Sequence, residues 1–134
     1  MMNSLMDGLK LVVMCRPVMD LVVFEEYEAG TRNGFVKSYL RETKRLYLVE
    51  EFKDGVRDGV VRTYHDDGIT VWLSEMYKGG KKDGLTVNYD RDGNKFIERL
   101  YEKGVLVNLV EYNFGFKKVE EIYKDGVIVS KKYL

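Results

Sequence analysis

The sequence predicts an all-β fold, a meander of stacked antiparallel β-hairpins that forms one elongated, twisted sheet. Its 134 residues include 13 Gly and 10 Tyr but a single Pro, a composition that favours strands and tight turns. A motif recurs along the chain at a nearly constant interval, and most glycines follow Asp or Asn. Together these observations predict about ten to twelve strands joined mainly by short turns.

The recurring motif is an aromatic residue followed three positions later by glycine. In three units a second glycine follows four residues after the first, and a tyrosine follows five residues after that. Because the period is 22 to 25 residues, each unit is long enough for about one hairpin. The predicted structural signature is Tyr27, Gly30, Gly34, Tyr39, Phe52, Gly55, Gly59, Tyr64, Tyr77, Gly80, Gly84, Tyr89, Tyr101, Gly104, Tyr123 and Gly126.

The Asp-Gly and Asn-Gly pairs predict two-residue hairpin turns, since both residue types tolerate positive φ. In one unit we expect strands over 60–64 and 70–77, a turn over 65–68 and a loop over 78–83. Gly68 and Tyr77 are nine residues apart, whereas Gly93 and Tyr101 are eight apart. Since one residue would move the aromatic to the other face, a different turn or a β-bulge must absorb the change.

The pattern divides the chain into three parts. Residues 1–24 are a degenerate N-terminal repeat or cap, residues 25–126 carry the regular hairpins, and residues 127–134 form a capping strand. Because the regular residues are used by the architecture, the irregular ends, 1–24 and 105–134, are the better places for a specific contact.

Residues 51–59 (Glu-Phe-Lys-Asp-Gly-Val-Arg-Asp-Gly) and 75–84 (Glu-Met-Tyr-Lys-Gly-Gly-Lys-Lys-Asp-Gly) resemble MORN-type repeats. The form is the variant common in bacteria and in some large DNA viruses, including the YwqK-like antitoxin family, and it covers roughly residues 25–126. This resemblance implies a single sheet of stacked hairpins that binds proteins, itself or, in some members, lipids. It implies no enzymatic activity and no cofactor.

The balance of charges limits the class of partner, and the cysteine content indicates the compartment. Lys plus Arg and Asp plus Glu are balanced at 22 each, so no net field would attract nucleic acid or an anionic membrane. Cys15 is the only cysteine, which excludes an internal disulfide and favours a reducing compartment. With no signal peptide in the first residues, we expect a cytoplasmic protein of a bacterium or virus-infected cell, or a component of a viral particle.

Two polar segments contain residue types that occur in catalytic or metal sites. His65 precedes Asp66 and Asp67 at a turn, but no nucleophile accompanies it, so a turn role is the better interpretation. The segment 90–94 resembles the start of a calcium loop, yet Tyr101 stands where a bidentate acid is required. We therefore expect no catalytic residue, no metal and no cofactor.

A row of charged residues precedes each motif aromatic by two positions. We expect it to be structural, with Lys37 and Arg62 lying between the carboxylates; an acidic recognition strip is the alternative. The row consists of Glu25, Glu50, Glu75, Arg99 and Glu121.

Three apolar residues are candidate contacts with a partner. Trp72 alternates with Val71 and Leu73 and is expected on the exposed side of the sheet, where a tryptophan is a good interface anchor. Met14 and Met19 belong to a methionine-rich N-terminal segment, which fits either a core or an adaptable surface.

The prediction for function is a non-enzymatic protein-interaction or structural assembly module that binds another protein or itself through a sheet face or a terminal strand. An antitoxin or immunity protein that masks a toxin is the alternative, and peripheral lipid binding is less favoured.

Overall fold

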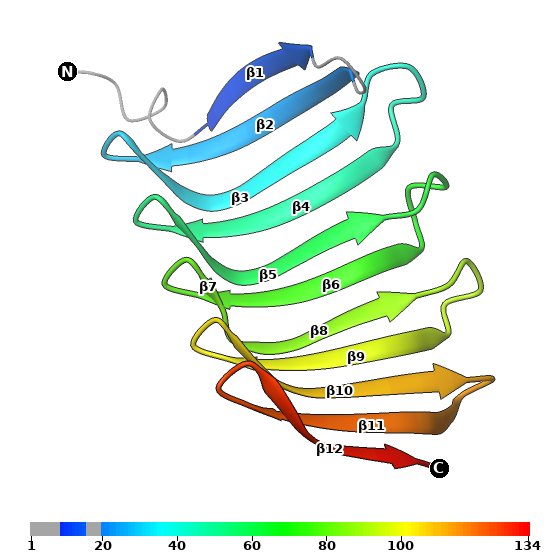
Figure 1. The fold of residues 1–134 in the computed structure, drawn as a ribbon. Helices are drawn as coiled ribbons and strands as arrows, with labels where there is room; N and C mark the ends of the chain where they lie inside the picture. Colours follow the sequence, from blue (N-terminus) through cyan, green and yellow to red (C-terminus); the bar gives the residue numbers. More distant parts are fainter. Residues whose placement is uncertain (1–8, 16–19) are drawn as a thin grey trace.

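The computed structural model describes residues 9–15 and 20–134, with side chains from Leu21 onward. These residues form one open antiparallel sheet, and the predicted meander is confirmed: eleven strands lie side by side in chain order, and the short β7 pairs with β6 (Figure 1). The strands are β1 (Leu9–Cys15), β2 (Asp20–Glu28), β3 (Thr31–Leu40), β4 (Leu46–Lys53), β5 (Val56–Tyr64), β6 (Val71–Lys78), β7 (Lys81–Lys82), β8 (Gly84–Tyr89), β9 (Lys95–Glu102), β10 (Val105–Asn113), β11 (Phe116–Lys124) and β12 (Val127–Tyr133).

The first glycine of each unit makes a tight hairpin turn. These turns lie at one end of the strands, on the left in Figure 1. Both central residues of each turn have positive φ, as in Asp54 (51°) and Gly55 (86°). Such a turn matches the right-handed twist of the strands it joins. The turns are 29–30, 54–55, 79–80, 103–104 and 125–126, and the turn 114–115 lies at the opposite edge.

The second glycine of each unit is not in a turn, and that part of the prediction is wrong. Gly34 and Gly59 lie inside β3 and β5, with φ of 105° and 112°. Each stands where the register with the preceding strand shifts, between Glu25 and Tyr27 or between Glu50 and Phe52. The glycine therefore permits a bulge, which bends the strand. Likewise, the expected loop over 78–83 is a tight turn followed by β7.

Longer loops lie at the other end of the strands. Their different lengths account for the one-residue difference between the Gly68–Tyr77 and Gly93–Tyr101 spacings. Residues 65–70 connect β5 to β6, and the shorter 90–94 connects β8 to β9. Each loop is closed by a backbone hydrogen bond, from His65 N to Thr70 O (2.8 Å) and from Asp90 N to Asn94 O (2.8 Å). A different turn length, rather than an extra bulge, thus restores the register.

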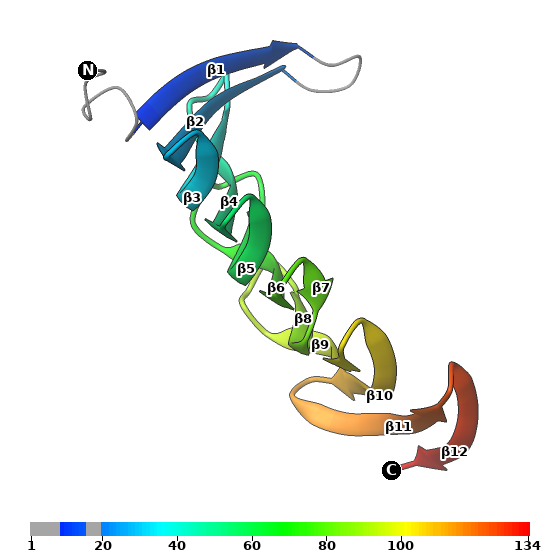
Figure 2. The same ribbon diagram turned by 90° about the vertical axis from the view of Figure 1, so that its left-hand side faces the viewer.

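The core lies on the sheet itself, because no second layer covers it in the described part of the chain. Leu21, Val23, Val36 and Phe52 form a buried cluster, and Val61 is 2% exposed. Cross-strand register places Val61 opposite Glu75, whereas the buried Val87 lies opposite the neighbouring residue, Ser74. Thr86, the neighbour of Val87, is also buried and points to the opposite face. In β8, therefore, side chains are buried on both faces of a sheet whose strands are visibly curved and twisted (Figure 2).

A substitution at the second glycine tests the bulge. We expect Gly59→Ala to lower the free energy of unfolding by about 1–3 kcal/mol, because alanine is strained at this φ and its Cβ would collide with the Glu51 carboxylate. Asp54→Asn, in the neighbouring turn, is the control and should change stability by less than about 0.5 kcal/mol, because Asn also adopts positive φ. Chemical denaturation of the two variants measures both values, and equal, small effects would contradict the assignment.

Candidate interaction surfaces

A carboxylate–cation pair spans each of the first three hairpins on one face of the sheet. The carboxylates of Glu25, Glu50 and Glu75 are mostly buried, so each needs a partner to offset its loss of hydration. The partners come from the strand after the tight turn: Arg32 (2.5 Å), Arg57 (2.6 Å) and Lys82 (3.1 Å). We call these three cations and their carboxylates the ladder.

Each ladder cation also reaches the aromatic residue of the next hairpin. The guanidinium carbon of Arg57 lies 5.2 Å from the centroid of the Tyr77 ring, and Arg57 donates to the Tyr77 hydroxyl (3.3 Å). Arg32 lies 5.2 Å from the Phe52 centroid, and Lys82 Nζ lies 5.0 Å from the Tyr101 centroid. A cation over an aromatic face is attracted by the ring quadrupole, so the side chain that neutralises one hairpin also holds the next.

The backbone repeats this connection. Gly55 N donates to Arg32 O (2.9 Å), Gly80 N to Arg57 O (2.8 Å) and Gly104 N to Lys82 O (2.7 Å). The tight turn of each hairpin is therefore fixed to the cation residue of the hairpin before it. In the last two hairpins, Leu106 and Ile128 occupy the position opposite the motif aromatic, so the ladder ends after Lys82.

The ladder changes the proton affinity of its cations. Partial burial alone would lower the pKa of Arg57, but its hydrogen bond to Glu50 and the negative charge of that carboxylate outweigh this effect and raise the pKa. Desolvation and the Glu75 carboxylate act on Lys82 in the same two directions, and its pKa is also raised. The cations therefore stay charged over the physiological range.

The row of acidic residues is structural, but its predicted partners are wrong. Val36, not Lys37, lies opposite Glu25, and Val61, not Arg62, lies opposite Glu50 and Glu75. Since alternate residues of a strand point to opposite faces, Lys37 and Arg62 lie on the other face. Because the carboxylates are buried and paired within the chain, they do not form an exposed acidic strip.

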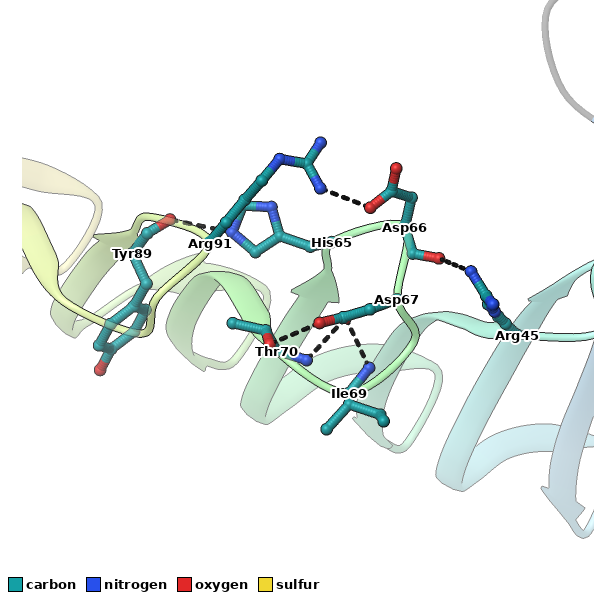
Figure 3. Close-up of polar contacts among 8 residues, drawn as sticks. All are labelled: Arg45, His65, Asp66, Asp67, Ile69, Thr70, Tyr89 and Arg91. Atoms are coloured by element: carbon teal, nitrogen blue, oxygen red, sulfur yellow. Dashed lines mark hydrogen bonds and ion pairs between the residues drawn. The ribbon is translucent and has the colours of Figure 1, made fainter.

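A cluster of polar contacts joins the loops at the opposite edge (Figure 3). Asp66 accepts from Arg91 (2.5 Å), and its backbone oxygen accepts from Arg45 (3.0 Å). His65 Nε2 lies 3.1 Å from Tyr89 O. The hydrogen bond and charge of Arg91 lower the pKa of Asp66. These contacts link three successive loops, although exposed ion pairs of this kind contribute little to stability.

Two aspartates cap these loops. Asp67 Oδ1 accepts from the backbone N–H groups of Ile69 and Thr70 (2.8 Å each), and Asp67 Oδ2 accepts from the Thr70 hydroxyl (2.6 Å). Asp90 Oδ1 accepts from the N–H groups of Asp92 and Asn94 (2.9 Å each). In the segment that resembles the start of a calcium loop, the Asp90 side chain therefore binds the chain's own backbone.

Trp72 is exposed, as expected, but the alternation of side chains along the strand is not the reason for its exposure. Thr63 pairs with Leu73 and Tyr64 with Val71, so Trp72 is the unpaired residue of a bulge and is 43% exposed. Tyr47 and Phe96 occupy the equivalent bulges of the neighbouring hairpins; Tyr47 packs against the core cluster. A bulge can be recognised only from the pairing of two strands. The sequence therefore did not show that Tyr47 and Phe96 occupy positions equivalent to Trp72.

The two candidate methionines lie in the part of the chain before Leu21, where only the backbone of β1 and Asp20 is described. Met14 lies in β1 opposite Leu21 in the backbone register, and Met19 lies outside the described residues.

The last two strands and the turn before them carry most of the highly exposed apolar side chains; Ile69, on a central loop, is the exception at 80% exposed. Phe114 is 91% exposed and Phe116 is 74% exposed at the tight turn between β10 and β11. On β12, Val127 and Val129 are 64% and 59% exposed. Isolated surface apolar residues are ordinary, but neighbouring ones on an open strand form a candidate contact surface.

No protein-family model matches the sequence, and no curated protein matches it. The described residues contain no helix that is long and apolar enough to cross a membrane. Over the same part of the chain, His, Cys, Asp and Glu side chains form no group of three that could hold a metal ion. The likeness to MORN-type repeats therefore stays a prediction from sequence.

Titration of Asp67 tests the loop geometry. The Thr70 hydroxyl, followed by the N–H groups of Ile69 and Thr70, holds the pKa of Asp67 at about 2, below its ordinary value of 3.8. Because the pKa is depressed in the folded state, the cap is fully formed above pH 3.8 and is lost as the pH falls through about 2. NMR titration should show this, and Thr70→Val should raise the pKa of Asp67 while Thr70→Ser leaves it low. An unchanged pKa in Thr70→Val would contradict the assignment.

Proposed function

We propose that this chain is a non-enzymatic protein-interaction or structural assembly module. The observation that carries the proposal is the number of exposed apolar side chains on the last strands of the sheet: Phe114 and Phe116 at the β10–β11 turn, and Val127 and Val129 on β12. Neighbouring exposed apolar side chains on an ordered strand are typical of sites that bind another protein.

The use of the charged residues supports the same proposal. The buried carboxylates of the ladder neutralise cations that hold successive hairpins together, and Asp67 and Asp90 cap loops. These groups are engaged in building the sheet. In the part of the chain that the structure describes, the sheet leaves its outer strands and the exposed parts of its faces open, and these are the parts of such a fold that accept partners.

The resemblance to MORN-type repeats also supports a role in protein interaction. The favoured role is part of a structural assembly, and the alternative is an antitoxin that binds a toxin. A lipid surface is the least favoured partner, because the charges of the chain are balanced and give no long-range attraction to anionic membranes.

Affinity purification of the tagged chain from its native cell, with identification of the bound protein, tests the proposal. We expect wild type to retain a protein partner or a second copy of itself, and Phe114→Ser/Phe116→Ser to retain less of it. Ile69→Ser is the matched control, because Ile69 is 80% exposed on a loop of the central hairpins.

The outcomes are distinct. A retained protein that is toxic when expressed alone selects the antitoxin form, and a structural protein selects the assembly form. A chain that binds no protein and no second copy, but floats with lipid vesicles, would contradict the proposed function.

A further inference from the structure

The face of the sheet opposite the ladder carries a row of side chains that crosses β2 to β6, which lie side by side in Figure 1. Each residue of the row stands directly opposite the next in the backbone register, so the side chains share one face. We call these residues the outer row: Phe24, Lys37, Val49, Arg62 and Ser74.

The two cations of the outer row are not neutralised by the chain. Among residues 21–134, whose side chains the structure describes, neither Lys37 nor Arg62 makes an ion pair or lies over an aromatic ring. The ladder cations of the same two strands, Arg32 and Arg57, do both. Lys37 and Arg62 are also exposed in the middle of the face. Their charges are therefore available to a partner.

Lys37 borders a hollow of about 260 Å³. The other walls of this hollow include Phe24, Phe35 and Tyr39. The Phe24 and Tyr39 rings meet edge to face, with their centroids 5.8 Å apart, and Phe24 and Phe35 remain exposed. An apolar side chain of a partner can enter between these rings while an acidic group beside it reaches Lys37.

Arg62 borders a second hollow on the same face, of about 290 Å³. Val71 and Tyr89 give this hollow apolar walls, and Ser74 adds a hydroxyl group. The hydroxyl of Thr70, which also lines it, already donates to Asp67 (2.6 Å). Arg62 is therefore the charged donor of the second hollow, as Lys37 is of the first.

The two hollows are separated by a fixed interval. Lys37 and Arg62 occupy equivalent positions of successive units, two residues before Tyr39 and Tyr64. One strand lies between them, and its half-buried Val49 stands opposite both cations. Because neighbouring strands are about 4.7–4.9 Å apart, the two cations are about 10 Å apart across an apolar side chain.

The carboxylates on this face limit the class of partner. Glu26 accepts a hydrogen bond from Phe35 N (2.8 Å), and Glu51 accepts one from Val60 N (3.3 Å), so both serve the bulges and not the cations. Their charges would repel a continuous polyanion such as nucleic acid or an anionic membrane. A protein can instead place separate carboxylates at the two cations and apolar side chains elsewhere.

We propose that the outer row is an interaction surface for an acidic segment of a partner protein. The segment places two carboxylates about 10 Å apart, one at Lys37 and one at Arg62, and an apolar side chain between them against Val49. The apolar walls of the two hollows exclude water from these ion pairs and so strengthen them. The inference rests on the proposed interaction function and adds to it a second surface and the chemistry of the partner.

Selection from a library of random peptides displayed on phage tests the inference without a known partner. We expect peptides that bind the immobilised wild-type chain to be enriched in Asp and Glu and to carry apolar residues between them. Binding of one selected peptide, measured by fluorescence anisotropy, should weaken by at least about tenfold in Lys37→Glu/Arg62→Glu. It should also weaken as the salt concentration rises.

The matched control is Lys53→Glu/Lys78→Glu, which makes the same change in charge. Lys53 and Lys78 are exposed at the ends of β4 and β6. Lys53 is four residues from Val49, about 13 Å along the strand and beyond a Debye length. Peptide affinity should change by less than about threefold in this control. Lys37→Gln/Arg62→Gln, which adds no negative charge, should also weaken binding, and an unchanged unfolding midpoint shows that each variant is folded.

Three results would overturn the inference. The first is a selection that yields no binding peptide, or peptides without enrichment in acidic residues. The second is an affinity that Lys37→Glu/Arg62→Glu leaves unchanged; if Phe114→Ser/Phe116→Ser lowers it instead, the proposed interaction function stands and only this surface is wrong. The third is binding to duplex DNA or to phosphatidylserine vesicles that is tighter than peptide binding and is lost in Lys37→Glu/Arg62→Glu.

Discussion

No second layer packs against the sheet in residues 9–15 and 20–134, so the buried side chains must be covered by their neighbours on the same sheet. The rest of the structure depends on this constraint. Glu50 is buried enough to require a cation, and Arg57 supplies it from the adjacent strand while lying against Tyr77 of the next hairpin. One side chain thus offsets the desolvation of a carboxylate and adds packing between hairpins. Where Leu106 and Ile128 replace the cation, the ladder stops, and the exposed apolar surface lies in the same part of the sheet.

Local signals in the sequence were sufficient to predict the fold. Alternation of apolar and polar residues, the period of the aromatic motif and turn residues such as Asp54-Gly55 act over a few positions, and in a meander each strand pairs with its neighbour in the chain. The prediction of the all-β meander and its strand number therefore needed no long-range information. The structural interpretation of the Glu25 row was also correct, because its spacing matched the hairpin period.

The details that failed depend on register between strands. Gly34 and Gly59 were assigned to turns because Asn-Gly and Asp-Gly favour positive φ, yet a bulge needs the same conformation inside a strand. Lys37 pairs with Phe24 and so lies on the other face from Glu25, whereas the two-position shift places Arg32 opposite Tyr27, within reach of Glu25. The bulge that exposes Trp72 was hidden for the same reason, since an unpaired residue is recognisable only against its partner strand.

The central claim, that a ladder cation of one hairpin holds the aromatic residue of the next, is tested most directly by a double-mutant cycle of Arg57→Gln and Tyr77→Leu. Measured by chemical denaturation, the two substitutions should be coupled by about 0.5–2 kcal/mol. The matched cycle of Arg62→Gln with Tyr77→Leu should be additive within about 0.5 kcal/mol, because Arg62 lies on the other face. Additive effects for Arg57 and Tyr77 would contradict the claim.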